Sequence, residues 1–221
     1  MHKTFFTCIK YLIILLVLQH STMPVAAQQA DHSKDSILRL GEFEKEGEAP
    51  SIKHGDTVIS KIEKGNFVMD IKRANRFWIL HFGYPAFNDQ VDILEIKLKM
   101  TADSLPAVYG FSWNAVMSNI PDTWDDYMFM LSTDKQFCIY TEKDEKYIGI
   151  SGWLPSFDVY STGYNIVRIE KRADNLYKFY VNDELVFQKK LPPLNLQFAG
   201  LYTDPHAILY VDYIKLATFK K

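Results

Sequence analysis

The feature that most constrains this chain is the series of strand-like segments between Tyr164 and Leu216. It reads YNIVRIEKRADNLYKFYVNDELVF, then a proline-containing connection, then FAGLYTDPHAILYVDYIKL. In Val167-Arg168-Ile169-Glu170, apolar and charged side chains alternate, which is typical of a strand with one face on a core and the other toward water. Ala173-Asp174-Asn175 and Asn182-Asp183 place residues that tolerate positive φ between such segments, so we expect hairpins there.

The same strand-like sequence pattern begins near residue 55 and continues almost to the end of the chain. The predicted strands are Thr57–Ile62, Phe67–Lys72, Phe77–Phe82, Ile93–Met100, Ala107–Trp113, Tyr127–Leu131, Gln136–Tyr140, Tyr147–Ile150, Asn165–Lys171, Tyr177–Val181, Leu196–Tyr202 and Ile208–Leu216. No window of about 11 residues after the N-terminal segment shows convincing helical periodicity. Many short segments with close turns predict an all-β fold, a two-sheet antiparallel sandwich or barrel.

The first 27 residues have the three parts of a secretory signal peptide. Lys3 and Lys10 are basic, Tyr11–Leu18 is an apolar run, and Val25-Ala26-Ala27 supplies the small side chains that a signal peptidase reads. A membrane-spanning helix needs about 20 apolar residues, and this run is far shorter. We therefore expect cleavage before Gln28, export to the periplasm or the extracellular space, and no membrane span afterwards.

The chain divides into a signal peptide (1–27), a polar N-terminal arm (28–54) and one β-sandwich domain (55–221). Within the arm, Ile37–Leu40 could form a short strand or one helical turn, and the rest is interpreted as a tether or loose arm. Loss of Lys3 and Lys10 would lower the formal charge from −2 to −4, because the first 27 residues contain no acidic residue. Such a mildly acidic, mixed surface gives no electrostatic basis for binding nucleic acid. The cysteine that remains, Cys138 in QFCIY, cannot form an intrachain disulfide, and we expect it to be a small buried apolar residue.

The order of these segments resembles the laminin-G or concanavalin A-like jelly roll, in particular the modules of exported bacterial proteins. The matching segments are GNFVMDIKR, DILEIKLKM, VYGFSWNA, DYMFMLSTDKQFCIYTEKDEKYIGISGW, YNIVRIEKRADNLYKFYVNDELVF and FAGLY with ILYVDYIKL. Gly110–Trp113, Tyr180–Asp183 and Val211–Tyr213 occupy the places of family motifs, with Asp183 where the family usually has glycine. The resemblance spans about residues 56–216 and implies a jelly roll. This fold hosts lectins, glucanases and inert spacers, so it does not by itself fix the function.

The resemblance also provides a test for catalysis. Laminarinase-type glucanases of this fold carry Glu-x-Asp-x-x-Glu or Glu-x-Asp-x-Glu on one strand, which places the carboxylates on the same face. The Glu-x-Asp of this chain is Glu142-Lys143-Asp144, and the residues that follow, Glu145-Lys146-Tyr147, complete neither version. The segment also lies in a predicted hairpin turn. We therefore do not expect a glucanase of this type and predict no catalytic residue.

Pro121–Tyr127 (PDTWDDY) is the most acidic aromatic loop. Asp122, Asp125 and Asp126 could ligate calcium or sugar hydroxyls while Trp124 stacks on a sugar ring. The alternative, which we favour, is a solvated loop whose tryptophan covers the edge of the sandwich, because tight calcium sites need more oxygen ligands at defined spacing. Calcium is the one cofactor that the sequence suggests.

Further aromatic residues form a second candidate surface: Trp78, Trp113, Trp153, Tyr84, Tyr109, Tyr140 and Tyr160. Stacked aromatic rings suit glycan binding, but a sandwich core needs large rings too, and each residue is individually more typical of a core. Trp113 lies on the strand expected to line the concave sheet and is followed by Asn114, so a binding face is expected there first. Trp153 is interpreted as structural.

The sequence therefore predicts an exported, non-catalytic module that binds a glycan or another cell-envelope component. The predicted ligand-binding residues are Trp113, Asn114, Trp124, Asp122, Asp125, Asp126 and Trp78. One alternative is a glycoside hydrolase-like enzyme, which requires two carboxyl groups facing each other across a groove. The other is a structural protein-interaction domain. Asp212, in an apolar strand, is expected to bond to the backbone or to a nearby Lys or Arg.

Overall fold

The computed structural model describes residues 29–43, 53–54, 58–72, 78–81, 91–117, 124–144, 146–196 and 198–220. The predicted signal peptide lies outside these residues. Within the strands, the side chains of residues 39, 53, 54, 78–81, 117 and 124 are not described. Among the described residues, no helix is long and apolar enough to cross a membrane.

One layer is a nine-stranded sheet. Its strands follow the order β14 (Glu184–Lys190), β13 (Leu176–Val181), β12 (Asn165–Lys171), β6 (Ile93–Ala102), β16 (Ala207–Phe219), β4 (Asn66–Ile71), β3 (Val58–Glu63) and β2 (Lys53–His54). The ninth strand, β1 (Asp35–Glu42), also pairs with β16. The long strand β16 thus has β6 along one side, and β4 and β1 one after the other along the other side.

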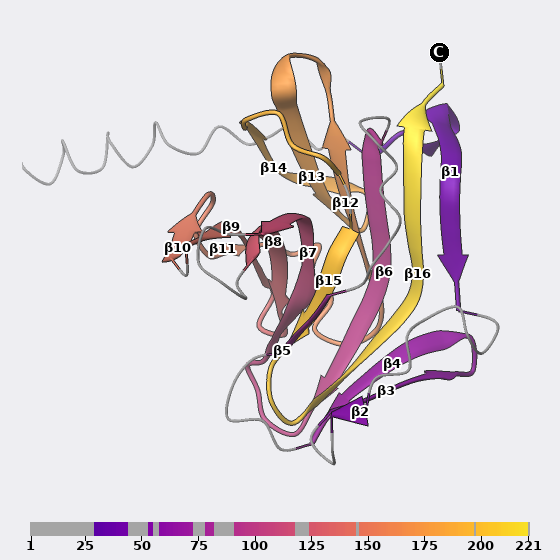
Figure 1. Cartoon of the computed structure of the whole chain (residues 1–221), viewed down its shortest axis with the longest axis vertical. Helices are drawn as coiled ribbons and strands as arrows, with labels where there is room; N and C mark the ends of the chain where they lie inside the picture. Colours follow the sequence, from indigo (N-terminus) through magenta and orange to yellow (C-terminus); the bar gives the residue numbers. More distant parts are fainter. Residues whose placement is uncertain are drawn as a thin grey trace, which may run out of the picture.

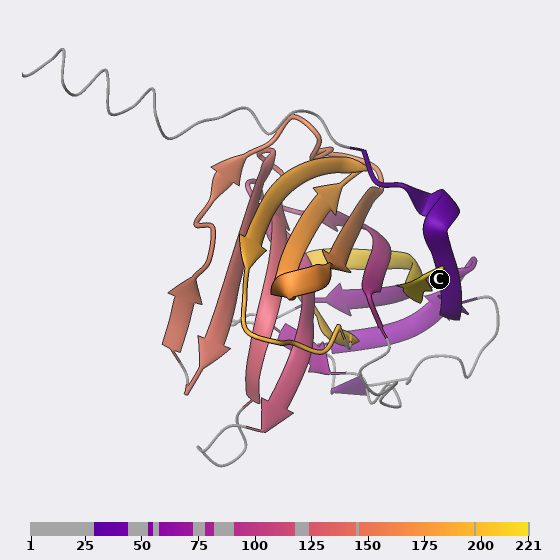
Figure 2. The ribbon, with the colours of Figure 1, turned by 90° about the horizontal axis from the view of Figure 1, so that it is seen from above.

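The second layer is a seven-stranded sheet that faces the first (Figure 2). Its strands follow the order β10 (Lys146–Gly149), β9 (Gln136–Lys143), β8 (Trp124–Ser132), β7 (Val108–Met117), β15 (Phe198–Thr203) and β5 (Trp78–His81), with β11 (Leu154–Pro155) paired to β9. Apart from two 3-10 turns, η1 (His32–Lys34) and η2 (Ala173–Asn175), no helix occurs in the described part of the chain. The predicted all-β antiparallel sandwich is confirmed.

The core lies between the two sheets and is rich in aromatic rings. Phe179 on β13 reaches across the layers to Trp113 on β7 and to Phe129 on β8, with ring centroids 6.0 Å and 5.7 Å away. All three side chains are fully buried. Because alternate residues of a strand face opposite sides, these contacts also fix which residues of β7 and β8 face outward.

Residues 29–43 belong to the sandwich, whereas the sequence suggested a loose polar arm at 28–54 with a short strand or helical turn at Ile37–Leu40. β1 runs antiparallel to β16 along the side of the molecule in Figure 1, from Asp35 opposite Phe219 to Glu42 opposite Tyr213. The Asp35 carboxylate bonds to Arg168 Nη1 and Nη2 and to Lys215 Nζ, each at 2.8 Å. This part of the arm is therefore attached by strand pairing with β16 and by a buried ion cluster. Its polar composition alone does not reveal either attachment.

The hairpin turns occur where they were predicted. Asp174, Asn175, Asn182 and Asp183 all have φ between 50° and 70°. In the turn between β13 and β14, the Asn182 side chain accepts from the backbone N–H of Ile166 at 2.8 Å and donates to Asp158 O at 2.6 Å. The short polar side chains therefore support a left-handed backbone, which explains why the turn tolerates Asp183 in place of glycine.

Asp212 has the partner that was expected of it. It lies at an irregularity of β16 between Val211 and Tyr213, and its Oδ2 forms an ion pair with Lys97 Nζ at 2.6 Å. Both side chains are about one-third exposed, so the pair contributes at most about 1 kcal/mol to stability. Its role is structural and lies on the nine-stranded sheet.

Candidate functional site

The outer face of the seven-stranded sheet carries the features that a core does not explain. Since Tyr109, Phe111 and Trp113 face the core, Val108 and Ser112 on the same strand face outward. Met128, Met130 and Tyr202 pack together on this outer side as a cluster separate from the main core. The sheet therefore has a second apolar surface, and that surface adjoins a cavity.

The cavity, which we call the aromatic pocket, has a volume of about 350 Å³. Its walls come from strands β7, β8, β9, β10 and β15 and from the segments that follow β10 and β15. The lining residues are Val108, Met130, Tyr140, Tyr147, Trp153, Tyr202 and Asp204. Three tyrosines and a tryptophan thus surround one carboxylate, and the volume falls within the range of about 300–1,000 Å³ that is usual for small-ligand sites.

Two of these rings are exposed to solvent. Tyr147 is 66% exposed and Trp153 is 45% exposed. Tyr147 stands edge-to-face on Tyr140, with centroids 5.4 Å apart and an interplanar angle of 82°. Exposed aromatic side chains that line a cavity typically mark a binding surface. This position differs from the structural role that the sequence suggested for Trp153.

Asp204 provides the charge of the pocket. Its Oδ2 accepts the backbone N–H of Val108 at 2.6 Å, which fixes the carboxylate at the start of β7. Burial raises the pKa of Asp204, while Val108 N–H and the Tyr202 hydroxyl lower it by a smaller amount. Burial, followed by the charge of Asp204, raises the pKa of Tyr202, so this phenol keeps its proton. The carboxylate therefore sits in a partly apolar environment with neutral neighbours.

A pair of carboxyl groups lies on the same face beside the pocket. Asp126 on β8 is directly opposite Glu142 on β9, and Met128 in the next outward row is opposite Tyr140. Asp126 is 2% exposed, and burial raises its pKa to about 7, with further contributions from the nearby charges of Glu142 and Asp125. Ser112 lies near enough to lower this pKa, yet neither Ser112 Oγ nor Asp126 Oδ1 completes a hydrogen bond with the described residues.

The predicted ligand-binding residues do not assemble into one site. Trp113 is fully buried in the core beside Phe111, Tyr127 and Phe179, so its predicted role as a ligand contact is wrong. Asn114 lies at the bulge of β7 with φ 54°, and its Oδ1 accepts the backbone N–H of Asn195 at 2.8 Å. It thus attaches the segment before β15 to β7.

The remaining predicted residues are only partly described. Trp78 begins β5 opposite Thr203, and Trp124 begins β8 opposite Met117, but neither side chain is described. Asp122 lies outside the described residues. Their predicted roles in binding therefore stay predictions.

The geometry does not bring Asp125 and Asp126 together as ligands of one calcium ion. Consecutive residues in a strand face opposite sides, and Asp125 Oδ1 instead accepts the backbone N–H of Asp144 at 2.9 Å. Asp144 occupies the turn between β9 and β10 with φ 48°, so the incomplete Glu-x-Asp motif does run into a hairpin turn. Asp125 thus supports that turn.

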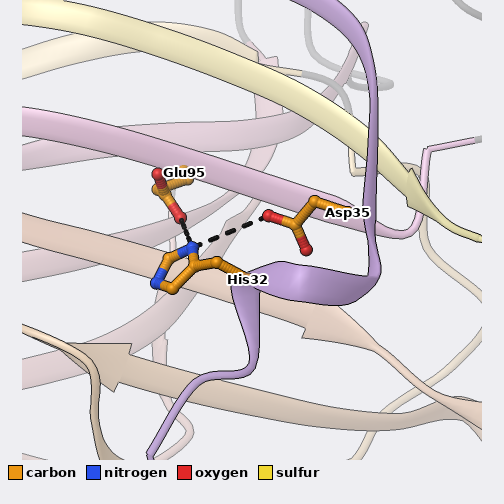
Figure 3. Close-up of side chains that lie close together, drawn as sticks. All are labelled: His32, Asp35 and Glu95. Carbon is orange, nitrogen blue, oxygen red and sulfur yellow. Dashed lines mark ion pairs between the residues drawn. The ribbon is translucent and has the colours of Figure 1, made fainter.

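On the nine-stranded sheet, His32, Asp35 and Glu95 converge and could in principle hold a metal ion (Figure 3). His32 Nδ1 lies 3.6 Å from Asp35 Oδ2 and 3.5 Å from Glu95 Oε2. However, Arg168 Nη1 lies 2.8 Å from Asp35 Oδ2, 3.0 Å from Glu95 Oε2 and 3.3 Å from His32 Nδ1. The guanidinium therefore already supplies the positive charge that an ion would bring, and the cluster is better described as a buried ion pair network.

Sequence reasoning did not identify Tyr147, Tyr202 and Asp204 as site residues, although all three fall in or next to predicted strands. The signal that would have found them is the register: Tyr202 pairs with Gly110, Met128 with Tyr140 and Tyr147 with Glu142. Neither segment alone determines which distant segment it pairs with. Asp204 was interpreted as part of a turn.

Comparison with known proteins supports the fold and not a family. No protein-family profile matches the sequence, and no curated protein sequence matches it. Solved structures do match. A structure from a study of endo-acting O-glycanases, with which members of the human gut microbiota initiate mucin breakdown, has a TM-score of 0.57 at 12% identity, and the match covers 84% of this chain and 100% of that one. The fold is a concanavalin A-like jelly roll.

Two further structures show the range of proteins on this fold. A point mutant of the carbohydrate recognition domain of Emp46p has a TM-score of 0.55 at 14% identity, with 72% of this chain and 85% of that chain covered. A prokaryotic β-1,3-1,4-glucanase (lichenase) from a mouse hindgut metagenome has a TM-score of 0.52 at 9% identity, with 80% and 97% covered. At such low identity the similarity establishes the jelly roll and leaves the activity to be argued from the site.

Proposed function

We propose that this chain binds a carbohydrate on the outer face of the seven-stranded sheet, with a sugar ring seated in the aromatic pocket. The observation that carries the proposal is the exposure of Tyr147 and Trp153 around a cavity that also contains a carboxylate. An apolar ring face can stack on the C–H face of a sugar, while a carboxylate accepts hydrogen bonds from its hydroxyls. The pocket offers both kinds of contact within about 350 Å³.

Two further considerations support a glycan. The solved structures with similar folds include a carbohydrate recognition domain and carbohydrate-degrading enzymes. The N-terminal segment predicts export, which would bring the pocket into contact with extracellular or envelope polysaccharides. Binding without chemistry is the simpler function, because Asp126, whose raised pKa would suit a proton donor, is only 2% exposed and lies beside the pocket instead of lining it.

A glycan array and affinity electrophoresis with the purified chain test this proposal. We expect retention by at least one polysaccharide, strongly reduced in Tyr147→Ala and Trp153→Ala, which remove exposed rings and should leave the fold intact. Phe157→Ala is the matched control, because Phe157 is 94% exposed and does not line the pocket. Binding that is equal in all three variants, or no glycan bound by the wild type, would overturn the proposal.

One observation favours glycoside hydrolysis as a second candidate. Residues directly opposite in an antiparallel pair have Cβ atoms about 4.5–5.5 Å apart, which lets their carboxyl groups reach the separation of about 5–5.5 Å that retaining glycosidases use. Asp126 and Glu142 are such a pair, and a pKa of about 7 would let Asp126 donate a proton at neutral pH. In this case Glu142 would be the nucleophile.

Release of reducing sugar from the glycans that bind on the array distinguishes the two candidates. Hydrolysis predicts turnover with retention of anomeric configuration, abolished by Glu142→Gln and by Asp126→Asn, with glycan binding preserved. Binding without turnover over long incubation excludes the enzyme and leaves the binding proposal in place.

A further inference from the structure

The aromatic pocket has the composition of a site for an organic cation. Its rings are Tyr140, Tyr147, Trp153 and Tyr202, and no Lys or Arg is among the described residues that line it. The face of an aromatic ring is electron-rich and attracts an ammonium group that lies within about 6 Å of the ring centroid. A cage of several rings with one carboxylate can therefore hold a positive charge from several sides.

Two carboxylates lie in or beside the pocket. Asp204 lines it, and Glu142 lies across the β9–β10 pair from Tyr147. The charge of Glu142 also raises the pKa of Tyr140, after the larger effects of burial, Tyr147 and Asp126, so Glu142 acts on the pocket. Burial raises the pKa of Asp204, and the groups that lower it, Val108 N–H and the Tyr202 hydroxyl, are neutral, so neither is a positively charged neighbour. A bound cation would supply that neighbour and relieve the cost of the buried charge.

A neutral sugar would use this pocket less well. Sugar hydroxyls seek acceptors and donors in similar numbers, but in the described lining the Tyr202 hydroxyl bonds to Asp204 and the Tyr147 hydroxyl bonds to Glu142. Val108 N–H is already used by Asp204. A group with donors only, such as an ammonium, matches a lining of aromatic rings and a carboxylate acceptor.

We propose that the aromatic pocket binds the ammonium group of a glycan that carries a free amine, that is, a de-N-acetylated amino sugar. The ammonium group lies among the rings of Tyr140, Tyr147 and Tyr202 against Asp204, and the pyranose ring stacks on Trp153. This inference rests on the proposed glycan-binding function and adds the class of sugar. Acetylation of the amine removes its charge and adds bulk at the same position, so the pocket discriminates against the N-acetylated form.

The test is isothermal titration of the purified chain with two oligosaccharides that differ only in acetylation, a glucosamine hexamer and an N-acetylglucosamine hexamer. We expect the glucosamine hexamer to bind at least about tenfold more tightly at low salt. Trp153→Ala and Asp204→Asn should each weaken its binding by about tenfold, while Phe157→Ala leaves it unchanged. Asn keeps an oxygen that can accept the Val108 N–H, so Asp204→Asn tests charge with little change in shape.

Small organic cations test whether the pocket recognises the ammonium group without the sugar. Choline and tetramethylammonium should compete with the glucosamine hexamer. If either one binds and the hexamer does not bind measurably, the ligand is a free quaternary ammonium compound and the amino-sugar assignment is overturned. Equal affinity for both hexamers, or Asp204→Asn without effect, overturns the cation inference. If neutral glycans still bind on the array and depend on Trp153, the proposed glycan-binding function stands without it.

Discussion

Replacement of Asp35 by asparagine should destabilise the sandwich, although the residue lies in a segment of polar composition near the N-terminus. The Asp35 carboxylate is 5% exposed and contacts Arg168, itself 1% exposed, through two bonds of 2.8 Å. Desolvation opposes its charge, but bonding to Arg168 and Lys215 outweighs this and lowers its pKa from 3.8 to about 2. At about 1.4 kcal/mol per pKa unit, the charged form contributes about 2 kcal/mol to the folded state.

The expected loss in Asp35→Asn is somewhat larger than this contribution. Removal of one member of a buried ion pair costs about 3–5 kcal/mol, because the partner stays buried, but here Arg168 keeps Glu95 and Glu170. We therefore expect about 3 kcal/mol, which for a domain of this size lowers Tm by about 6–12 °C. The assay is thermal and urea unfolding at pH 7, with Asp31→Asn as the matched control, since Asp31 lies in the same segment and is exposed.

The contribution of Asp35 to stability should decrease as the pH falls. The folded-state pKa of Asp35 lies below the unfolded value, so its contribution is complete above about pH 5, declines as the pH falls below about 4 and is lost below about 2. The difference between wild type and Asp35→Asn should therefore be constant from about pH 5 to 8 and shrink between about pH 4 and 2. A variant as stable as Asp31→Asn at pH 7 would refute the view that residues 29–43 are an integral part of the fold.

Three further predictions concern the seven-stranded sheet. Trp113→Ala should cost about 3–5 kcal/mol in urea unfolding because it empties a fully buried core position, and a loss below about 1 kcal/mol would contradict that placement. Asp126 has a folded-state pKa of about 7 against 3.8 for the free residue, so the wild type should lose about 4 kcal/mol of stability between pH 4 and pH 8. Asp126→Asn should lack this loss, and a variant with the same pH profile as the wild type would count against the burial of that carboxyl group. Gly110→Ala should prevent proper folding, because a Cβ there would lie 2.1 Å from Phe129 O, so a soluble variant with wild-type Tm would contradict the close approach of β7 and β8.

The fold was largely predictable because its signals are local. Alternation along β6 and β12, and turn residues such as Asn182 and Asp183, depend on neighbours in sequence, and each predicted strand overlaps an observed one. The local signal is weaker at β14, which was expected only through the turn before it, and at β1, where Ile37–Leu40 suggested either a strand or a helical turn. β14 ends in Gln188-Lys189-Lys190 at the exposed edge of its sheet, and β1 is held by Arg168 and Lys215, which are far away in sequence.

The candidate site was less predictable because it depends on register and on which face of a strand is outward. Trp113 and Ser112 are neighbours in sequence, yet one faces the core and the other the outer side, and the period of two does not say which. Asp126 and Glu142 belong to two motifs that are separate in the sequence and meet because β8 pairs with β9. Trp153 resembled a structural residue because only the assembled sheet places Tyr140, Tyr147 and Tyr202 around it.

Tryptophan fluorescence during a glycan titration tests the central claim most directly, because Trp153 is the half-exposed indole of the pocket while Trp113 is sealed in the core. A glucosamine hexamer should change the emission of the wild-type chain in a saturable manner. In Trp153→Phe the hexamer should still bind by calorimetry, since a phenyl ring can stack, but the fluorescence change should disappear. A fluorescence change of the same size in Trp153→Phe, or calorimetric binding to the wild type without any change in emission, would place the ligand elsewhere and contradict the account.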